Sequence, residues 1–139
     1  MTVRRRLWLA RLLIAAVFFI NVEVGLEFII RPEIFAPGFE VSGVVGAAIV
    51  RAIGLLFLMW NVPYAFAAFH PMKQRVSLYE ALIMQTIGLV GESYILWNLP
   101  SGHPAAAATI TRFIAFDGSG LVVLLIAFAL TYKLKPEAC

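Results

Sequence analysis

Four long apolar runs constrain the fold of this chain more than any other feature of its sequence. A helix needs about 20 residues to cross the ~30 Å hydrocarbon core of a bilayer. Each run has about that length or more, and proline or glycine occurs in every connection between runs. The predicted spans are 7–30, 43–69, 77–99 and about 113–132. No segment alternates with the period of a strand, so we expect an all-α fold with a single transmembrane domain over residues 1–139.

Composition excludes a water-soluble globule. Hydrophobic residues make up 62% of the chain and charged residues 14%, whereas soluble domains are near half apolar and a quarter charged. The basic start and apolar run resemble a signal peptide, but the run continues to Ile30 without a small-residue cleavage site, so we interpret it as a retained span. The single cysteine, Cys139, excludes an internal disulfide. Residues 105–112 either extend the fourth helix or form a short interfacial helix.

Basic residues flank the spans unevenly. One side of a four-span topology carries Arg4, Arg5, Arg6, Arg11, Lys73, Arg75, Lys133 and Lys135. The opposite side carries only Arg31 and, at its margin, Arg112. The positive-inside rule places the richer side in the cytoplasm. We therefore expect an up-down-up-down four-helix bundle in a bacterial inner membrane, with both termini cytoplasmic and lipids, not nucleic acid, as its surroundings.

Charged residues recur at one depth in all four spans. Glu23, Arg51, Glu92 and Asp117 each lie about 22–27 Å from the cytoplasmic edge of their span, counted at the helix rise. Glu27 lies one turn above Glu23. Because a lipid-facing charge is costly, we expect these five side chains to meet inside the bundle as an outward-facing polar site. They are the predicted ligand-binding residues, and Glu23, Glu92 and Asp117 are also the candidate catalytic ones.

The acids outnumber the bases at this depth, which leaves two interpretations open. A surplus carboxyl in a low-dielectric medium keeps its proton, binds a cation or lies in a wet cavity. The layer is therefore either a structural ion-pair network around Arg51 or a pocket. Nearer the cytoplasm, Asn61 and Gln85 are each about 12 Å deep and are predicted to hydrogen-bond to each other, beside a kink at Pro63. No motif indicates a metal site or a cofactor, and none is predicted.

Three short motifs prompt a family comparison. They are Arg31-Pro32-Glu33-Ile34-Phe35 after the first span, Arg51-Ala52-Ile53-Gly54 in the second, and His70-Pro71 before the third. With the four-span layout, they resemble the small bacterial DoxX-like families and related uncharacterised membrane families. The resemblance implies an accessory or redox-associated membrane subunit and assigns no catalytic residue.

The leading functional hypothesis is a non-catalytic accessory subunit, or one that binds a small apolar or amphipathic ligand, working within a larger membrane complex. One alternative is an acid–base enzyme acting on a lipid or isoprenoid, with Glu23 or Glu92 exchanging the proton. Another is a proton-coupled carrier that uses the same carboxyls. Whether the protein is an enzyme stays open at the level of sequence.

Overall fold

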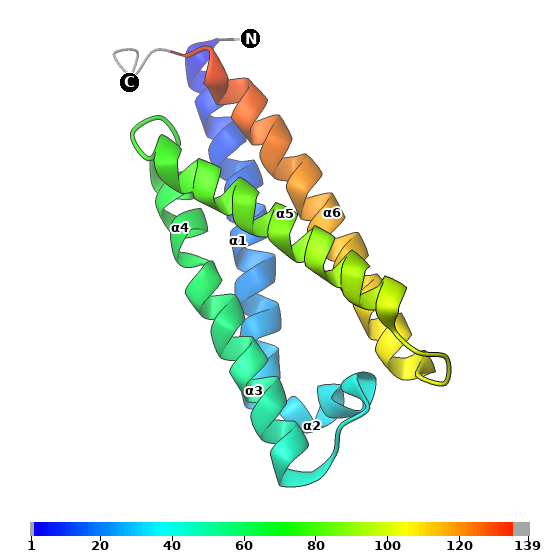
Figure 1. The fold of residues 1–139 in the computed structure, drawn as a ribbon. Helices are drawn as coiled ribbons and strands as arrows, with labels where there is room; N and C mark the ends of the chain where they lie inside the picture. Colours follow the sequence, from blue (N-terminus) through cyan, green and yellow to red (C-terminus); the bar gives the residue numbers. More distant parts are fainter. Residues whose placement is uncertain (1, 135–139) are drawn as a thin grey trace.

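The computed structural model describes residues 2–134, and these form helices joined by short connections, with no strand among them (Figure 1). The elements are α1 (Val3–Ile30), α2 (Pro32–Phe35), the 3₁₀ turn η1 (Ala36–Phe39), α3 (Gly43–Trp60), α4 (Val62–Phe69), α5 (Arg75–Asn98) and α6 (Pro104–Tyr132). Residues 105–112 therefore extend the fourth long helix. Lys135 and Cys139, used in the sequence analysis, lie outside the described residues.

Within residues 2–134, three helical segments are long and apolar enough to cross a membrane: Val3–Ile30, Gly43–Phe69 and Pro104–Tyr132. Only 17–28% of their most apolar windows is buried inside the protein. Large apolar side chains such as Leu12, Phe19 and Val122 consequently face outward. Exposed apolar surface of this extent marks contact with a membrane or a partner. Helix α5 has 24 residues but carries more polar side chains and is not one of the three.

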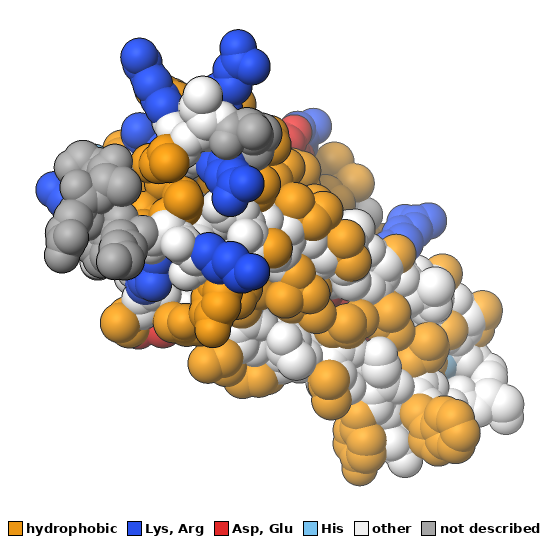
Figure 2. Space-filling view, turned by 90° about the horizontal axis from the view of Figure 1, so that it is seen from above, with side chains coloured by type: hydrophobic (Ala, Val, Ile, Leu, Met, Phe, Trp, Pro, Cys, Tyr) orange, Lys and Arg blue, Asp and Glu red, His pale blue; other side chains and the backbone are white. Residues whose placement is uncertain are grey.

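The long helices lie side by side with their connections at opposite ends (Figure 1). The start of α1, the α4–α5 connection and the end of α6 lie at one end, and α2 and the α5–α6 connection lie at the other. Lys and Arg side chains gather around the first end, whereas hydrophobic side chains cover much of the flank (Figure 2). Helix α1 packs against α3, α4 and α6, and α5 packs against α4 and α6.

A break at Asn61 divides the second predicted span into α3 and α4, as Pro63 predicts. Proline has no amide hydrogen and its ring disrupts the preceding turn. On the side of the break nearer the chain termini, α4 packs against α5, whereas α3, on the other side, packs against α1 and α2. Helices α3 and α5 therefore diverge towards the other end (Figure 1). The main buried cluster, which includes Ile14, Tyr64, Leu78 and Leu124, lies where α1, α4, α5 and α6 meet.

Glycine brings α1 and α3 together at their crossing. A Cβ placed on Gly54 would lie 2.6 Å from the carbonyl oxygen of Gly25, and one placed on Gly25 would lie 3.0 Å from that of Gly54. Small residues permit such close backbone approach in membrane helices. Beyond this crossing, Phe28 packs against rings from α2, α3 and α6, with centroid separations of 4.6 Å to Phe35 and 6.2 Å to Phe113.

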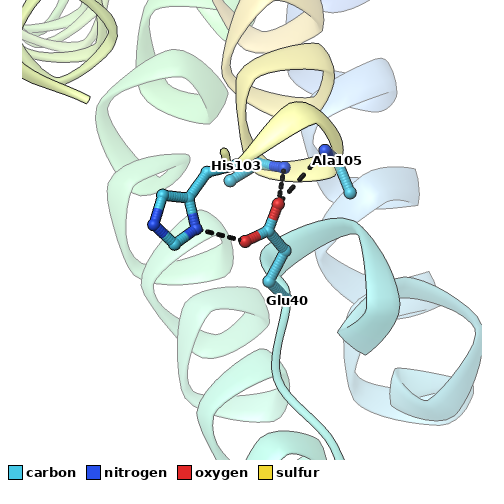
Figure 3. A network of polar contacts seen from close by, with 4 residues as sticks. Glu40, His103 and Ala105 are labelled. Atoms are coloured by element: carbon cyan, nitrogen blue, oxygen red, sulfur yellow. Dashed lines mark hydrogen bonds and ion pairs between the residues drawn. The ribbon is translucent and has the colours of Figure 1, made fainter. Parts of the chain in front are cut away.

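Glu40 ties the first connection to the start of α6 (Figure 3). Its backbone is left-handed at φ 56°, and its carboxylate accepts hydrogen bonds from the amides of Ala105 at 3.2 Å and Ala106 at 3.1 Å. His103 Nδ1 lies 2.5 Å from the second carboxylate oxygen. The bond with His103 and then the bond from Ala106 hold the pKa of Glu40 below its usual value. An acid at a helix N-terminus also interacts favourably with the helix dipole.

Candidate functional site: a polar cavity between α3 and α5

A cavity of about 350 Å³ lies where α3 and α5 diverge. Its walls are mainly apolar and come from Phe57, Trp60, Met84, Ile87 and Ile95. Several of these side chains, including Trp60, Ile87 and Ile95, are also exposed on the outer surface. The cavity is thus bounded by the same flank that carries the exposed apolar residues. Its polar lining comes from α1, α5, α6 and the α3–α4 break.

A hydrogen-bonded chain of three side chains runs across the polar part of this cavity. The Tyr64 hydroxyl donates to Gln85 Oε1 at 2.5 Å and lies 3.1 Å from the Ala81 carbonyl oxygen. Because Gln85 accepts through its oxygen, its amide nitrogen is directed to Asp117, where it donates to Oδ1 at 2.9 Å. Tyr64 and Gln85 are both almost completely buried. The chain therefore links α4, α5 and α6 and fixes one orientation of each side chain.

Two glycines make room for this chain between α5 and α6. A Cβ on Gly88 would collide with Asp117 Oδ2, and a Cβ on Gly120 would lie 2.6 Å from Gln85 Nε2. Each helix therefore lacks a side chain at the point where the polar group of the other helix rests. By contrast, a Cβ on Gly91 would meet nothing within 4 Å. Gly88 and Gly120 thus position the polar pair, whereas Gly91 borders open space.

Three buried oxygen atoms among the lining residues have no hydrogen-bond partner within the described chain: Asn21 Oδ1, Asn61 Oδ1 and Glu92 Oε2. Asn21 and Asn61 are 6% and 2% exposed. The Asn61 amide nitrogen donates to the Phe57 carbonyl at 2.6 Å, so its oxygen is the atom left over. A buried polar atom without a partner costs about 1–3 kcal/mol. The cavity is therefore lined by three residues that each hold an unused hydrogen-bond acceptor.

The predicted charge layer is only partly assembled. Glu92 and Asp117 line the same cavity. Glu23, however, is exposed on α1, and the expectation that it faces the interior is wrong. The buried stripe of α1 includes Asn21 and Gly25. Because Glu23 is two residues from each, it points roughly 200° away from them around the helix.

Arg51 also lies outside the cavity, so the expectation that it meets the other members of the charge layer is wrong. It is exposed beside the buried Val50 and reaches Glu33 of α2 at 3.4 Å. The connection between α1 and α3 folds back over α3 and brings Glu33 to Arg51. Counting depth within the spans does not consider partners from a connection. Glu27 pairs with Arg31 one turn later, and neither lines this cavity, so the expectation that Glu27 joins the site is wrong.

The predicted hydrogen bond between Asn61 and Gln85 is also wrong. Asn61 bonds to its own helix through Phe57, and Gln85 bonds to Tyr64 and Asp117 instead. Both residues nevertheless line the cavity, together with the carboxyls that were expected to form a separate layer. The sequence analysis missed Asn21 as a site residue, although it continues the stripe of Ile14 and Val17 at helical spacing.

Metal ligands do not cluster in residues 2–134: no group of three or more His, Cys, Asp or Glu side chains is placed to hold an ion. Comparison with protein-family models gave no match, and neither the curated proteins nor the solved structures yielded a similar chain. The geometry of the cavity is therefore the basis for assigning a function.

Proposed function

We propose that this protein is a four-span inner-membrane protein that binds a small amphipathic ligand in the cavity between α3 and α5. The cavity itself carries the proposal, because it combines about 350 Å³ of mostly apolar space with hydrogen-bonding groups at one side. Ligand sites typically have this composition, with a few polar groups that fix orientation. The ligand's apolar part would lie along Ile87 and Ile95, and its polar part would face Asp117 and Glu92.

The exposed apolar side chains around the cavity support access from the lipid. Trp60 is 51% exposed and Ile87 65% exposed, and both line the cavity. In a bilayer, these positions face acyl chains. A ligand that already partitions into the membrane can therefore reach the polar groups by moving sideways between α3 and α5. In this role the protein acts alone or as the accessory subunit that the DoxX-like resemblance implies.

Photolabelling tests the proposal with a pair of neighbouring substitutions. The purified protein in phosphatidylcholine nanodiscs is irradiated with a dodecyl probe carrying a diazirine at the end of its chain. Gly91→Trp fills the open space of the cavity, whereas Val90→Trp places the same ring on the exposed side of α5. We expect labels on α3 and α5 that Gly91→Trp abolishes and Val90→Trp preserves. Labelling that is insensitive to Gly91→Trp contradicts the proposal.

The topology is tested separately by cysteine accessibility in intact cells. In a Cys139→Ser background, Thr2→Cys and Ser101→Cys place single thiols at opposite ends of the long helices (Figure 1). The basic residues at the Thr2 end support a cytoplasmic location for that end. We expect a membrane-impermeant maleimide to label Ser101→Cys and not Thr2→Cys. The reverse pattern would invert the orientation. Labelling of both thiols, or of neither until the cells are permeabilised, would place them on the same side and remove α5 as a span.

A further inference from the structure

The charges that line the cavity have only one sign. Glu92 and Asp117 are its only ionisable residues besides Tyr64, and no Lys, Arg or His contributes to the lining. Asp117 already accepts a hydrogen bond from Gln85. Glu92 has no ion-pair partner among the described residues, and its Oε2 lacks a hydrogen bond. The site therefore offers unused hydrogen-bond acceptors beside acidic side chains, and no basic side chain lines it.

From this arrangement, and resting on the function proposed above, we infer that the ligand is an amphipathic primary amine bound as its ammonium. Its N–H groups would donate to Glu92 Oε2 and to the side-chain oxygen of Asn21 or Asn61. An ammonium has three donors and no acceptor, which matches a set of unpartnered acceptors. A positive charge also offsets a carboxylate that has no basic neighbour. The alkyl chain would follow the apolar wall of α3 and α5 into the bilayer.

Aromatic side chains support a cation in the same place. Phe57 and Trp60 line the cavity on the α3 side, and their ring centroids are 6.4 Å apart. The face of an aromatic ring attracts a cation, most strongly for tryptophan. A carboxylate ligand, by contrast, would meet two acids, and an alcohol would bring a single donor to three acceptors. A quaternary ammonium would bring the charge without any donor.

The inference is tested with four compounds that share a dodecyl chain: dodecylamine, dodecyltrimethylammonium, dodecanol and dodecanoate. Each competes with the neutral photolabel in phosphatidylcholine nanodiscs, and its concentration is expressed per mole of lipid to cancel differences in partitioning. We expect dodecylamine to bind at least about tenfold more tightly than dodecanol. A tenfold difference in affinity corresponds to ~1.4 kcal/mol. We expect the trimethyl compound to bind more weakly than the amine and dodecanoate to bind weakest.

Two substitutions that remove the same formal charge provide the control. Glu92→Gln removes the unpaired carboxyl of the cavity, whereas Glu23→Gln removes an exposed one on α1. The amine should lose its advantage over dodecanol in Glu92→Gln and keep it in Glu23→Gln. Equal binding of amine and dodecanol, equal binding of amine and trimethyl compound, or equal effects of the two substitutions would each overturn the amine assignment. Each of those results would still leave the cavity as a binding site. The proposed function itself would be refuted if no compound competed with the photolabel and Gly91→Trp did not change the labelling.

Discussion

Alanine substitutions at two glycines of α5 test whether the side chain of Asp117 packs against Gly88 in the hydrogen-bonded chain of Tyr64, Gln85 and Asp117. In Gly91→Ala the new methyl group meets nothing within 4 Å, so the variant should gain the ~0.5–1 kcal/mol by which alanine exceeds glycine within a helix. In Gly88→Ala the same gain is opposed, because the methyl group occupies the place of Asp117 Oδ2. The carboxyl must rotate away, and its 2.9 Å hydrogen bond from Gln85 is then lost.

The expected difference between the two variants equals the free energy of that hydrogen bond, because the gain in helix propensity cancels. Side-chain hydrogen bonds in membrane proteins average about 0.6 kcal/mol, and bonds to charged groups contribute up to about 3 kcal/mol. Gly88→Ala should therefore be less stable than Gly91→Ala by about 0.6–3 kcal/mol. The free energy of unfolding is measured by titrating the protein in mixed micelles with dodecyl sulfate and following the helical circular dichroism signal.

A third variant separates the proposed collision from other effects at Gly88. With Asp117→Ala as the background, the obstacle is absent, and Gly88→Ala should be as stabilising as Gly91→Ala. Such a double-mutant cycle isolates the coupling between the two positions. If Gly88→Ala and Gly91→Ala are equally stable in the wild-type background, Asp117 does not rest on Gly88 and the seating of the polar chain is wrong.

Three further predictions concern single side chains. Tyr64→Phe removes a buried hydrogen-bond donor and should lower the free energy of unfolding by about 1–3 kcal/mol. Tyr79→Phe removes a hydroxyl from an exposed side chain and should change that free energy little. Equal effects of the two substitutions would contradict the buried network. The folded-state pKa of Glu40 is lowered, so its stabilising contact is complete above its usual value of 4.5 and is lost as the pH falls below that value. Amides at the start of α6 should then lose protection from hydrogen exchange, corrected for intrinsic rates, and Glu40→Gln should remove this pH dependence; identical pH responses would refute the role of Glu40. Arg51→Gln breaks an exposed ion pair and should change the free energy of unfolding by less than about 1 kcal/mol without affecting photolabelling; loss of labelling would return Arg51 to the site.

The sequence predicts positions along each helix far better than rotation about it. The apolar runs and their Pro and Gly boundaries placed the long helices close to their observed ends, except that α6 begins at Pro104 and not near the predicted start at about 113. The depth count matched Glu92 with Asp117, which do share a cavity. The same count placed Glu23 beside them. Depth depends only on the helix rise, whereas the direction of a side chain depends on which stripe packs against neighbours. In α1 that stripe runs through Asn21, and Glu23 is directed away from it.

Counting depth along the helices also could not predict ion-pair partners that lie outside the spans. Arg51 meets Glu33 because α2 folds back over the start of α3, and the predicted spans contain no information about that connection. Tyr64 is not among the predicted site residues for a different reason. Its position near the predicted cytoplasmic edge favoured an interfacial anchor over a cavity-lining role, but the break at Asn61 turns α4 towards α5, where the hydroxyl meets Gln85.

The polarity of α5 follows from the cavity and supports α5 as a fourth span. Its 24 residues extend for about 36 Å, enough to cross the hydrocarbon core. Gln85, Gly88 and Glu92 lie three and four residues apart, which places them on one face of the helix, and all three line the cavity. That face meets Asp117 of α6, whereas Ile83, Ile87 and Val90 are exposed. A helix lying on the membrane surface would direct its polar face to water. In α5, Gln85 and Glu92 line the cavity instead, and the exposed Ile83, Ile87 and Val90 fit the proposed contact with lipid, although Glu80 and Ser93 are exposed as well.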